Sequence, residues 1–395
     1  MDRSRSQHRA SNELFWGQEI FDWETLFFVT ETLEKYHKPL RVHFDLNVSV
    51  VTYLDHRFVP YENSIGHDST DPRSSLVYEL TRSRGRESTD PRDRVFAMLG
   101  HFSAAVLLEG SPKFEADYTR STKDIYMDVA VRTLKGYPKL ELLNAVKSHD
   151  GVDNNSLPSW VPDCGGNYIR NLLGRGDALF RAAGDSAHSF SIHESQRVLG
   201  IKGLQVDTME RLSDELKWTD FDFKHIHGDH GSDRVSLKLW TEICQIPNFN
   251  LEHSYVNGES PVLAFCQALT AGCLNIRLAQ FRDIDYASIP SATWLQYSAA
   301  GLVNDAVKEA GEGGDAFAWN GSASALCDER SFFRIAKGYF SIGPCELEKD
   351  DVIVVLFGGT TPYALRPTTE GYKFVADCYV YGLMHGEAIL MMERE

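Results

Sequence analysis

The segment Val352–Gly359, VIVVLFGG, decides the fold of the C-terminal part of the chain. A continuous apolar run from Val352 to Phe357 ends at a Gly-Gly pair, which predicts a strand followed by a turn. A further strand is indicated at Tyr372–Asp377, where Tyr, Phe and Ala alternate with Lys, Val and Asp. Short strands of this kind predict a small antiparallel β-barrel or a strongly twisted sheet.

Upstream of this region the chain changes to helical patterns. In Glu87–Gly100, ESTDPRDRVFAMLG, Asp90 can cap a helix and Pro91 suits its first position. Gly100 can close this helix in the left-handed conformation. The face expected to be buried consists of Val95, Phe96 and Leu99. The segment therefore predicts a short helix that packs on a core.

A longer helix is predicted from Ser121 to Gly136. Ser121 suits the N-cap, with Asp124 three residues later, and Ile125 and Val129 repeat at helical spacing. Farther along, residues 196–210, QRVLGIKGLQVDTME, alternate apolar and polar positions, as a half-buried strand does. The chain is thus expected to be α+β, with a helical N-terminal half and a C-terminal β region.

Four segments, taken in order, have a pattern that belongs to a known family. They are Glu87–Gly100, Ala116–Val131 (ADYTRSTKDIYMDVAV), Leu157–Cys164 (LPSWVPDC) and Arg330–Ala388, which contains FFRIAKGYFSIGP, DDVIVVLFGG, YALRP and GYKFVADCYVYG. Together they resemble the fungal heterokaryon incompatibility (HET) family over most of residues 84–200 and 330–390. The resemblance implies that these segments form the region C-terminal to the HET domain.

The HET domain itself has no counterpart in the sequence. Its Tyr-x-x-Leu-Ser-Tyr-x-Trp-Gly-like opening and its Trp-Ile-Asp-like strand are both absent. Leu14–Leu33 resembles the short helix that follows that domain, so we expect the chain to begin where the HET domain ends. The resemblance assigns the triggering of cell death to the HET domain. Neither that activity nor a nucleotide-cleaving site is therefore carried over to this chain.

These patterns divide the chain into four expected parts. Residues 1–11 are a disordered leader, and residues 12–200 are a mainly helical region that follows the lost HET domain. Residues 201–325 form a divergent middle of helices and loops, and residues 326–395 form the C-terminal β region. Because the middle part of the chain has least in common with the family, we expect the function that is particular to this protein to reside there.

Composition limits the range of functions. The chain has 395 residues, of which 43% are hydrophobic, and 40 basic residues against 56 acidic ones give a formal charge of −16. This charge repels phosphate backbones and anionic lipid, so nucleic acid and membrane surfaces are poor partners. No stretch approaches the ~20 apolar residues of a membrane span. The seven cysteines are odd in number and form no C-x-x-C pair, which favours reduced thiols and a cytoplasmic location.

Motifs for cofactors are missing. The Gly-Gly pairs at 165, 313 and 358 lack the lysine and spacing of a phosphate loop, so no cofactor is predicted. His225, His227 and His230 in FDFKHIHGDHG are the metal candidate, because imidazoles at this spacing can reach one zinc or iron ion. A polar surface loop is the more ordinary interpretation of such a cluster, and we predict no metal.

His385 and Glu387, in YGLMHGEAI, are the nearest approach to a catalytic acid–base pair. On an extended chain residues two apart point to the same side, so Glu387 could orient a His385 that transfers protons near neutral pH. The alternative is that Glu387 is a structural residue bound to backbone or arginine. We keep both residues as candidate catalytic groups.

Three aromatic residues are candidates for binding a substrate. Trp160 lies between two prolines, where it could anchor a core or wall a pocket. Trp319 lies in residues 309–324, EAGEGGDAFAWNGSAS, which predict a flexible glycine-rich loop. Tyr381 is the third candidate. Cys164 could be a nucleophile only if a base lay beside it, so a buried structural thiol is the expected role.

Three classes of function compete, and one of them is a truncated remnant with no retained role, which the intact hydrophobic pattern argues against mildly. The other two are as follows. The first is a free-standing HET-derived protein that acts on an apolar small molecule in fungal specialised metabolism, as a cofactor-free cyclase, isomerase or Diels–Alderase-like pericyclase. The alternative is an allorecognition or regulatory module without catalysis, which binds a protein partner or a second copy of itself. A deep apolar cavity in residues 211–325 would favour the first, and an exposed apolar patch the second.

Overall fold

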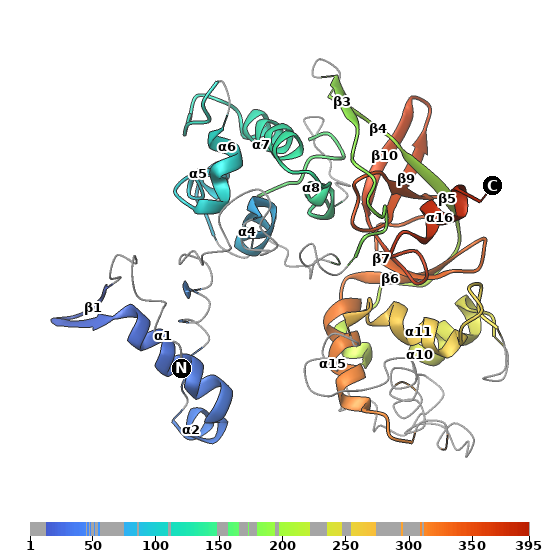
Figure 1. The fold of residues 1–395 in the computed structure, drawn as a ribbon, viewed down its shortest axis with the longest axis horizontal. Coiled ribbons are helices and arrows are strands. Elements are labelled where there is room, and N and C mark those ends of the chain that lie inside the picture. The colour runs from blue at the N-terminus through green and yellow to red at the C-terminus, as the bar shows by residue number, and fades with distance from the viewer. Residues whose placement is uncertain are drawn as a thin grey trace.

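The computed structural model describes residues 13–44, 75–84, 87–109, 112–147, 157–165, 180–193, 197–221, 235–246, 254–273 and 312–394, with a few single positions between them. Within these ranges a hairpin and two helices come first, then a group of short helices, and then a sheet with further helices beside it (Figure 1). The α+β class is confirmed. The expected leader at 1–11 lies outside the described residues.

The helices fall into three groups along the chain. Their bounds are α1 (Trp23–Tyr36), α2 (Lys38–His43), α4 (Leu76–Ser83), α5 (Asp93–Phe96), α6 (Ala105–Leu108), α7 (Thr122–Gly136), α8 (Glu141–Asn144), α10 (Val235–Lys238), α11 (Pro261–Leu269), α15 (Ala316–Cys327) and α16 (Glu387–Met392). Short 3₁₀ turns lie at η2 (Phe102–Ala104) and η3 (Trp218–Phe221), and η4 (Leu239–Ile243) is a π-helical turn.

Three antiparallel sheets are described. Two are hairpins, β1 (Glu13–Trp16) with β2 (Glu19–Asp22) and β3 (Phe190–His193) with β4 (Val198–Ile201). The third has the order β10-β9-β8-β5-β6-β7-β11. Its strands are β5 (Gly203–Leu212), β6 (Arg330–Ile335), β7 (Phe340–Pro344), β8 (Val352–Leu356), β9 (Tyr363–Thr368), β10 (Gly371–Asp377) and β11 (Tyr379–Val380).

The central strand of this sheet comes from the middle of the chain. On one side β5 pairs with β8, where Gly203 lies opposite Leu356. On the other side β5 pairs with β6, where Met209 lies opposite Ile335. The strand predicted at 196–210 is therefore present as β4 and β5. Because β6 and β8 meet only through β5, the sheet depends on a pairing between distant segments of sequence.

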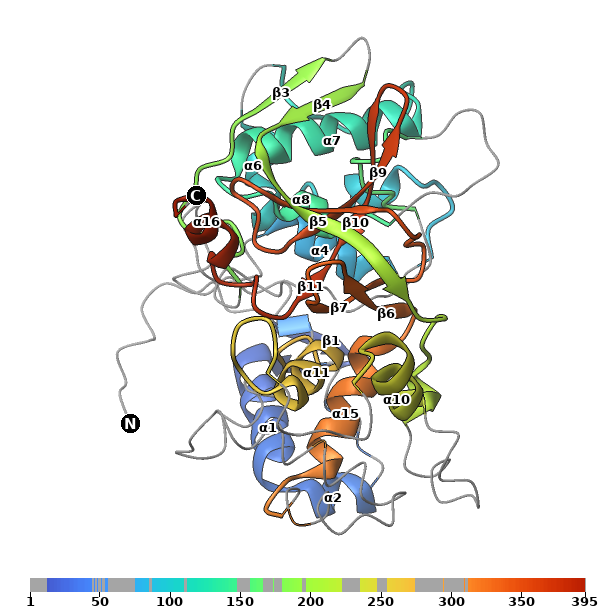
Figure 2. The same ribbon diagram turned by 90° about the vertical axis from the view of Figure 1, so that its right-hand side faces the viewer.

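The apolar run that defines β8 is buried on both faces of the sheet. Ile353 and Val355 belong to one buried cluster, with residues of α11 and α15, and we call it the α11 cluster. Val352, Val354 and Leu356 belong to a second, with residues of α4 and α7, called here the α7 cluster. Figure 2 shows the strands between these two groups of helices. A strand covered on both faces has no polar side, which explains the continuous run of apolar residues.

The sheet curls, although hydrogen bonds do not close it. β10 and β11 stand at its two opposite ends, yet only Cys378 separates them along the chain. The ends must therefore come close together in space. Among the described strands no ladder joins these two ends, so the sheet is open and not a closed barrel.

The helical group packs on the sheet through a buried polar network. The Tyr363 hydroxyl donates to Asn144 Oδ1 at 3.0 Å, and Asn144 Nδ2 donates to Thr360 Oγ1 at 3.2 Å. The Leu140 N–H also donates to the Gly358 carbonyl at 3.1 Å. These bonds join α8 to the turn between β8 and β9, so the position of the helices is set by specific polar contacts as well as by apolar packing.

Replacing Tyr363 with Phe is expected to destabilise the protein by about 1–3 kcal/mol. The ring is fully buried, so the change leaves the Asn144 oxygen without its donor and away from water. Urea unfolding followed by circular dichroism measures the change. Tyr372→Phe is the matched control because that ring is 57% exposed. Equal stability of the two variants would show that the buried bond contributes nothing.

The predicted helix at Ser121–Gly136 is confirmed. The Ser121 hydroxyl accepts the Asp124 N–H at 3.2 Å, and α7 ends at Gly136. A side chain at Gly136 would place its Cβ 1.9 Å from Val106 Cγ2, so α7 and α6 approach each other closely there. The glycine that ends the helix therefore also allows close packing.

Two local predictions need correction. The helix at Glu87–Gly100 is reduced to α5, and its N-cap is Arg92 and not the predicted Asp90, whose side chain accepts the Arg92 N–H at 2.9 Å. Val95 is buried, as expected. Gly100 does not adopt positive φ, so the left-handed ending is wrong. The flexible loop predicted around Trp319 is also wrong: Ala316–Cys327 is the helix α15, and Trp319 is fully buried. Packing against β6 and η3 outweighs the weak helix propensity of its glycine and serines.

Candidate functional site

The predicted catalytic pair lies at the start of α16. Gly386 is the N-cap, with φ of 96°, so the chain here is a turn and not the extended segment that the prediction assumed. Glu387 Oε2 accepts the backbone N–H of His385 at 2.6 Å. This bond therefore fixes the backbone at His385 and does not orient its imidazole. The His385 side chain is exposed, and its ring centroid lies 6.1 Å from that of Phe180. The catalytic roles of His385 and Glu387 stay predictions.

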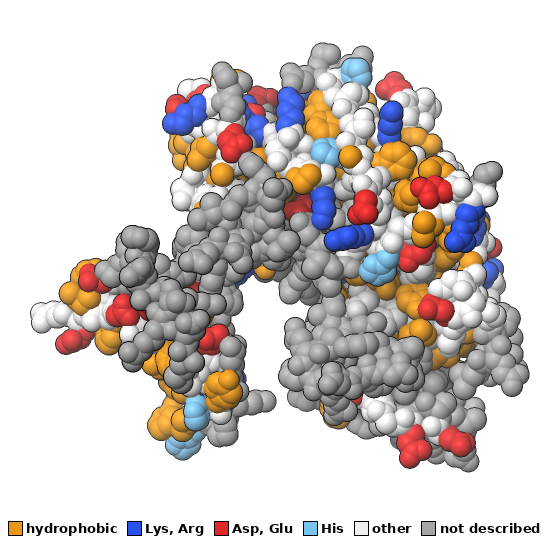
Figure 3. Space-filling view, viewed as in Figure 1, with side chains coloured by type: hydrophobic (Ala, Val, Ile, Leu, Met, Phe, Trp, Pro, Cys, Tyr) orange, Lys and Arg blue, Asp and Glu red, His pale blue; other side chains and the backbone are white. Residues whose placement is uncertain are grey.

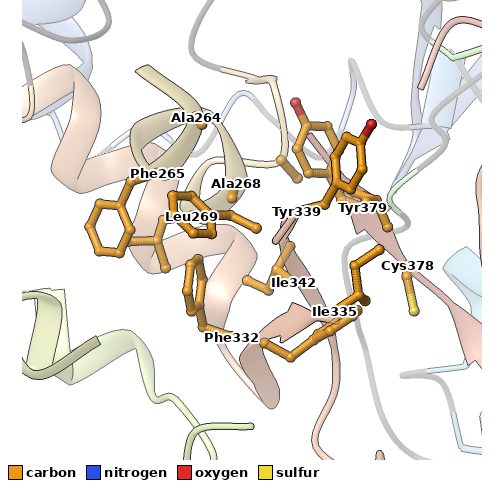
Figure 4. Packing of buried hydrophobic residues seen from close by; sticks show 14 of the residues in the cluster. Ala264, Phe265, Ala268, Leu269, Phe332, Ile335, Tyr339, Ile342, Cys378 and Tyr379 are labelled. Carbon is orange, nitrogen blue, oxygen red and sulfur yellow. The ribbon is translucent and has the colours of Figure 1, made fainter. Parts of the chain in front are cut away.

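Tyrosines gather beside this turn. We call Tyr255, Tyr339, Tyr379 and Tyr381 the tyrosine cluster. The Tyr381 hydroxyl donates to Glu259 Oε2 at 2.7 Å, and the Tyr255 hydroxyl accepts the Phe340 N–H at 2.7 Å. Figure 4 shows Tyr339 and Tyr379 among the residues of the α11 cluster, and ring contacts link Tyr255 with Tyr339 and Tyr379 with Phe180. Burial raises the pKa of Tyr379 well above its usual value, so its hydroxyl is a neutral donor and not a base.

The two predicted tryptophans belong to different clusters. Trp160 is buried in the α7 cluster, where its Nε1 donates to the Arg197 carbonyl at 3.0 Å. Trp319 is buried in the α11 cluster, 5.8 Å between ring centroids from Phe221. The structure thus does not bring Trp160 and Trp319 into one pocket with Tyr381. Their substrate-binding roles remain predictions.

Cys164 lines a small pocket in the helical group, with Arg84, Tyr126 and Leu142 among its neighbours. The pocket has a volume of about 10 Å³, which is room for about one water molecule and not for a substrate. Burial raises the pKa of the Cys164 thiol to about 12, so the thiolate needed for nucleophilic attack does not form near neutral pH. These observations favour the structural thiol over the nucleophile.

Thiol labelling of the native protein is expected to modify two cysteines rapidly. None of the seven cysteines forms a disulfide, and of these seven Cys273 and Cys345 are partly exposed while the others are buried. Titration with a chromogenic disulfide should therefore give two fast equivalents, and the other five only after denaturant is added. Rapid labelling of Cys164, detected by peptide mapping, would contradict the assignment of a buried thiol.

The metal candidate cannot be placed. His225, His227 and His230 lie outside the described residues. Among the residues that the structure does describe, no group of three or more His, Cys, Asp or Glu side chains is arranged to hold a metal ion. The same part of the chain contains no helix long and apolar enough to cross a membrane.

The most conspicuous surface is one that the sequence patterns did not single out. Residues 13–44, which comprise β1, β2, α1 and α2, are called here the apolar arm, and they project from the left of the molecule in Figure 1. Their exposed side chains include Phe15 (67%), Ile20 (58%), Phe28 (67%), Tyr36 (75%) and Phe44 (62%). Figure 3 shows hydrophobic side chains on this part of the surface. The run Leu26–Val29 was a possible signal, because four successive apolar residues cannot all face one core.

The apolar arm is hydrogen-bonded to a residue outside it and is ordered by a cap within it. Trp23 Nε1 donates to Asp55 Oδ1 at 2.8 Å, and Asp22 caps α1 by accepting the Thr25 N–H at 2.8 Å. The second contact is internal to the arm and fixes the junction of β2 with α1. The arm therefore has a defined internal structure while its apolar side chains remain exposed.

Comparison with known proteins gives one match. The Het-6 beta-barrel domain matches residues 318–395, which run from α15 through α16 and include every strand of the large sheet except β5. No curated protein and no solved structure matches the chain. Residues 318–395 are thus similar to the Het-6 beta-barrel domain, and this match confirms the resemblance to the HET family for the C-terminal region.

Proposed function

We propose that the chain is a protein-binding module of the allorecognition or regulatory kind, which binds its partner through the apolar arm. The observation that supports this proposal is the exposure of large apolar side chains from Phe15 to Phe44 on consecutive elements. Isolated apolar residues are common on protein surfaces, but a group rimmed by polar residues marks an interaction site. Aromatic side chains of this kind also contribute most of the binding energy at protein interfaces.

The exposed residues of α1 form one stripe. At about 100° per residue, Phe28, Val29 and Tyr36 fall within a sector of roughly 100°. They are 67%, 46% and 75% exposed, respectively. A helix with its apolar side turned to solvent lacks the packing that usually stabilises helices in water. Binding of a partner to this stripe would supply that packing.

The charges around the arm indicate the chemistry of the partner. Glu13, Glu19, Asp22 and Glu24 are exposed beside the apolar residues. A partner protein with an apolar face bordered by Lys and Arg is therefore complementary. A second copy of this chain is a poorer fit, because each copy carries a formal charge of −16 and the two would repel each other.

Replacing Phe28 and Tyr36 together with Asp is expected to weaken binding to the partner by at least about tenfold. The change puts charges into the apolar contact, where an unpaired charge is costly to bury. Tagged full-length chain is compared with this variant by affinity purification, and the protein lost from the variant is then titrated in purified form. Phe317→Asp is the matched control, since Phe317 is 77% exposed on α15 and outside the arm.

Both variants should keep the thermal unfolding midpoint of the wild type, because the altered side chains are exposed. If the purified partner bound the arm variant and the wild type with equal affinity, the arm would not be the binding site. If no protein depended on the arm, the proposed function itself would fail.

The tyrosine cluster favours a second candidate function. Its neutral hydroxyls, together with Glu259 and Glu387 nearby, are groups that could orient a small molecule in a cofactor-free cyclisation or isomerisation. Comparing metabolites from fungal strains with and without the gene tests this candidate. An unchanged profile would remove it and leave protein binding as the remaining proposal.

A further inference from the structure

We infer that the β1–β2 hairpin accepts an extended, Lys/Arg-rich segment of the partner as a third strand along the free edge of β1. This inference rests on the proposed protein-binding function and specifies how the arm recognises its partner. Among the described residues the hairpin pairs only with itself. A two-stranded hairpin is at best marginally stable in water, and a third strand or a packed helix is needed to stabilise it. Here β2 contacts α1, whereas the outer edge of β1 has no strand partner among the described residues.

The geometry of the hairpin leaves one edge open. Gly17, with φ of 64°, and Gln18 form a two-residue turn, and the facing pairs include Phe15 with Ile20. In such a hairpin the pair that closes the turn is hydrogen-bonded, and bonded and non-bonded pairs then alternate. The N–H and C=O groups of Phe15 consequently point outward from β1. Among the described residues no strand pairs with this outer edge of β1.

The side chains of the hairpin select the chemistry of the added strand. Phe15 and Ile20 form an exposed cross-strand pair on one face, and Phe21, which is 46% exposed, lies on the other. The charged residues of the hairpin are Glu13, Glu19 and Asp22, with no Lys or Arg among residues 13–22. An exposed edge ordinarily carries Lys or Pro to prevent strand addition, and β1 has neither. A segment that alternates apolar and basic residues is complementary to this hairpin, because its apolar side chains can contact the exposed apolar residues and its basic side chains can pair with the acidic ones.

The test uses the full-length chain and a short fluorescent peptide of alternating Lys and Val. We expect this peptide to bind, with affinity that falls as salt is added. The same peptide methylated on alternate backbone nitrogens should bind at least about tenfold more weakly, because it keeps its side chains but cannot form the ladder. A Glu-Val peptide should not bind, and the Glu13→Lys/Glu19→Lys variant should reverse the preference between the Lys-Val and Glu-Val peptides.

Hydrogen exchange provides the structural readout. Binding of the Lys-Val peptide should protect the Phe15 amide, whose N–H points to the open edge, and Phe15→Pro should remove the binding while Phe15→Ala retains part of it. Equal binding of the methylated and unmethylated peptides would overturn strand addition. So would a purified partner that needs Phe28 and Tyr36 but leaves the Phe15 amide unprotected. In that case the proposed protein-binding function would stand without this mode of recognition.

Discussion

Substituting Met209 with proline should unfold the seven-stranded sheet. Met209 lies in β5, its side chain is 1% exposed, and its N–H donates to the Asp351 carbonyl at 2.9 Å. Proline removes this donor, and a central strand does not tolerate it. The lost side chain and the unsatisfied carbonyl together cost about 3–8 kcal/mol. This is comparable with the ~5–15 kcal/mol that stabilises a typical domain.

The measurement is urea unfolding of the full-length chain, followed by far-ultraviolet circular dichroism and by tryptophan fluorescence. Met209→Leu is the matched control, because it keeps the volume and the N–H and should cost less than about 1.5 kcal/mol. A cooperative transition of the proline variant at the wild-type midpoint would show that β5 is not the strand that holds β6 and β8 together.

The second large effect is a loss of stability at alkaline pH. Burial raises the pKa of Cys164 from 9.0 to about 12 and that of Tyr137 from 10.0 to about 12. Below pH 9 both groups are protonated in the folded and unfolded chains, so they do not change the stability. Between pH 9 and pH 12 the unfolded chain releases protons that the folded chain retains. The free energy of unfolding should then fall by roughly 1 kcal/mol per pH unit for each such group.

Unfolding free energies measured in urea from pH 7 to pH 11 test this expectation. Cys164→Ala should reduce the slope above about pH 9, and Tyr137→Phe should reduce it above about pH 10, because each removes a group that ionises at lower pH in the unfolded chain than in the folded one. A stability that stays level up to pH 11 would contradict the buried, protonated state of these groups.

Local signals in the sequence predicted the elements that local forces determine. The cap at Ser121 and the helical spacing of Ile125 and Val129 predicted α7. The apolar run before Gly358 predicted β8. The hydrogen bonds of the Ser121 cap and of α7 join residues close in sequence, and the apolar run of β8 is a local pattern even though β8 pairs with the distant β5. The relationship of the C-terminal region to the HET family followed from motifs of the same local kind.

Other features depend on contacts between distant residues, which a single sequence does not reveal. Nothing in residues 203–212 indicates that β5 lies between β6 and β8. Trp319 is helical because α15 is buried against other elements, although its own sequence suggests a loop. At the candidate catalytic pair, the left-handed Gly386 turns the chain so that Glu387 accepts a backbone N–H. Exposure of the apolar arm likewise depends on what the rest of the chain leaves uncovered.

The position of β5 also has a consequence for synthesis of the chain. A ribosome completes β5 long before β6 and β8, its two neighbours in the sheet, leave the exit tunnel. At ~5–20 residues per second, this interval is on the order of ten seconds. During that time β5 is a strand without partners on either edge, which is the condition for mispairing and aggregation. Messages truncated before β8 should therefore produce aggregating protein, and chaperone binding during translation should be strongest between the emergence of β5 and that of β8.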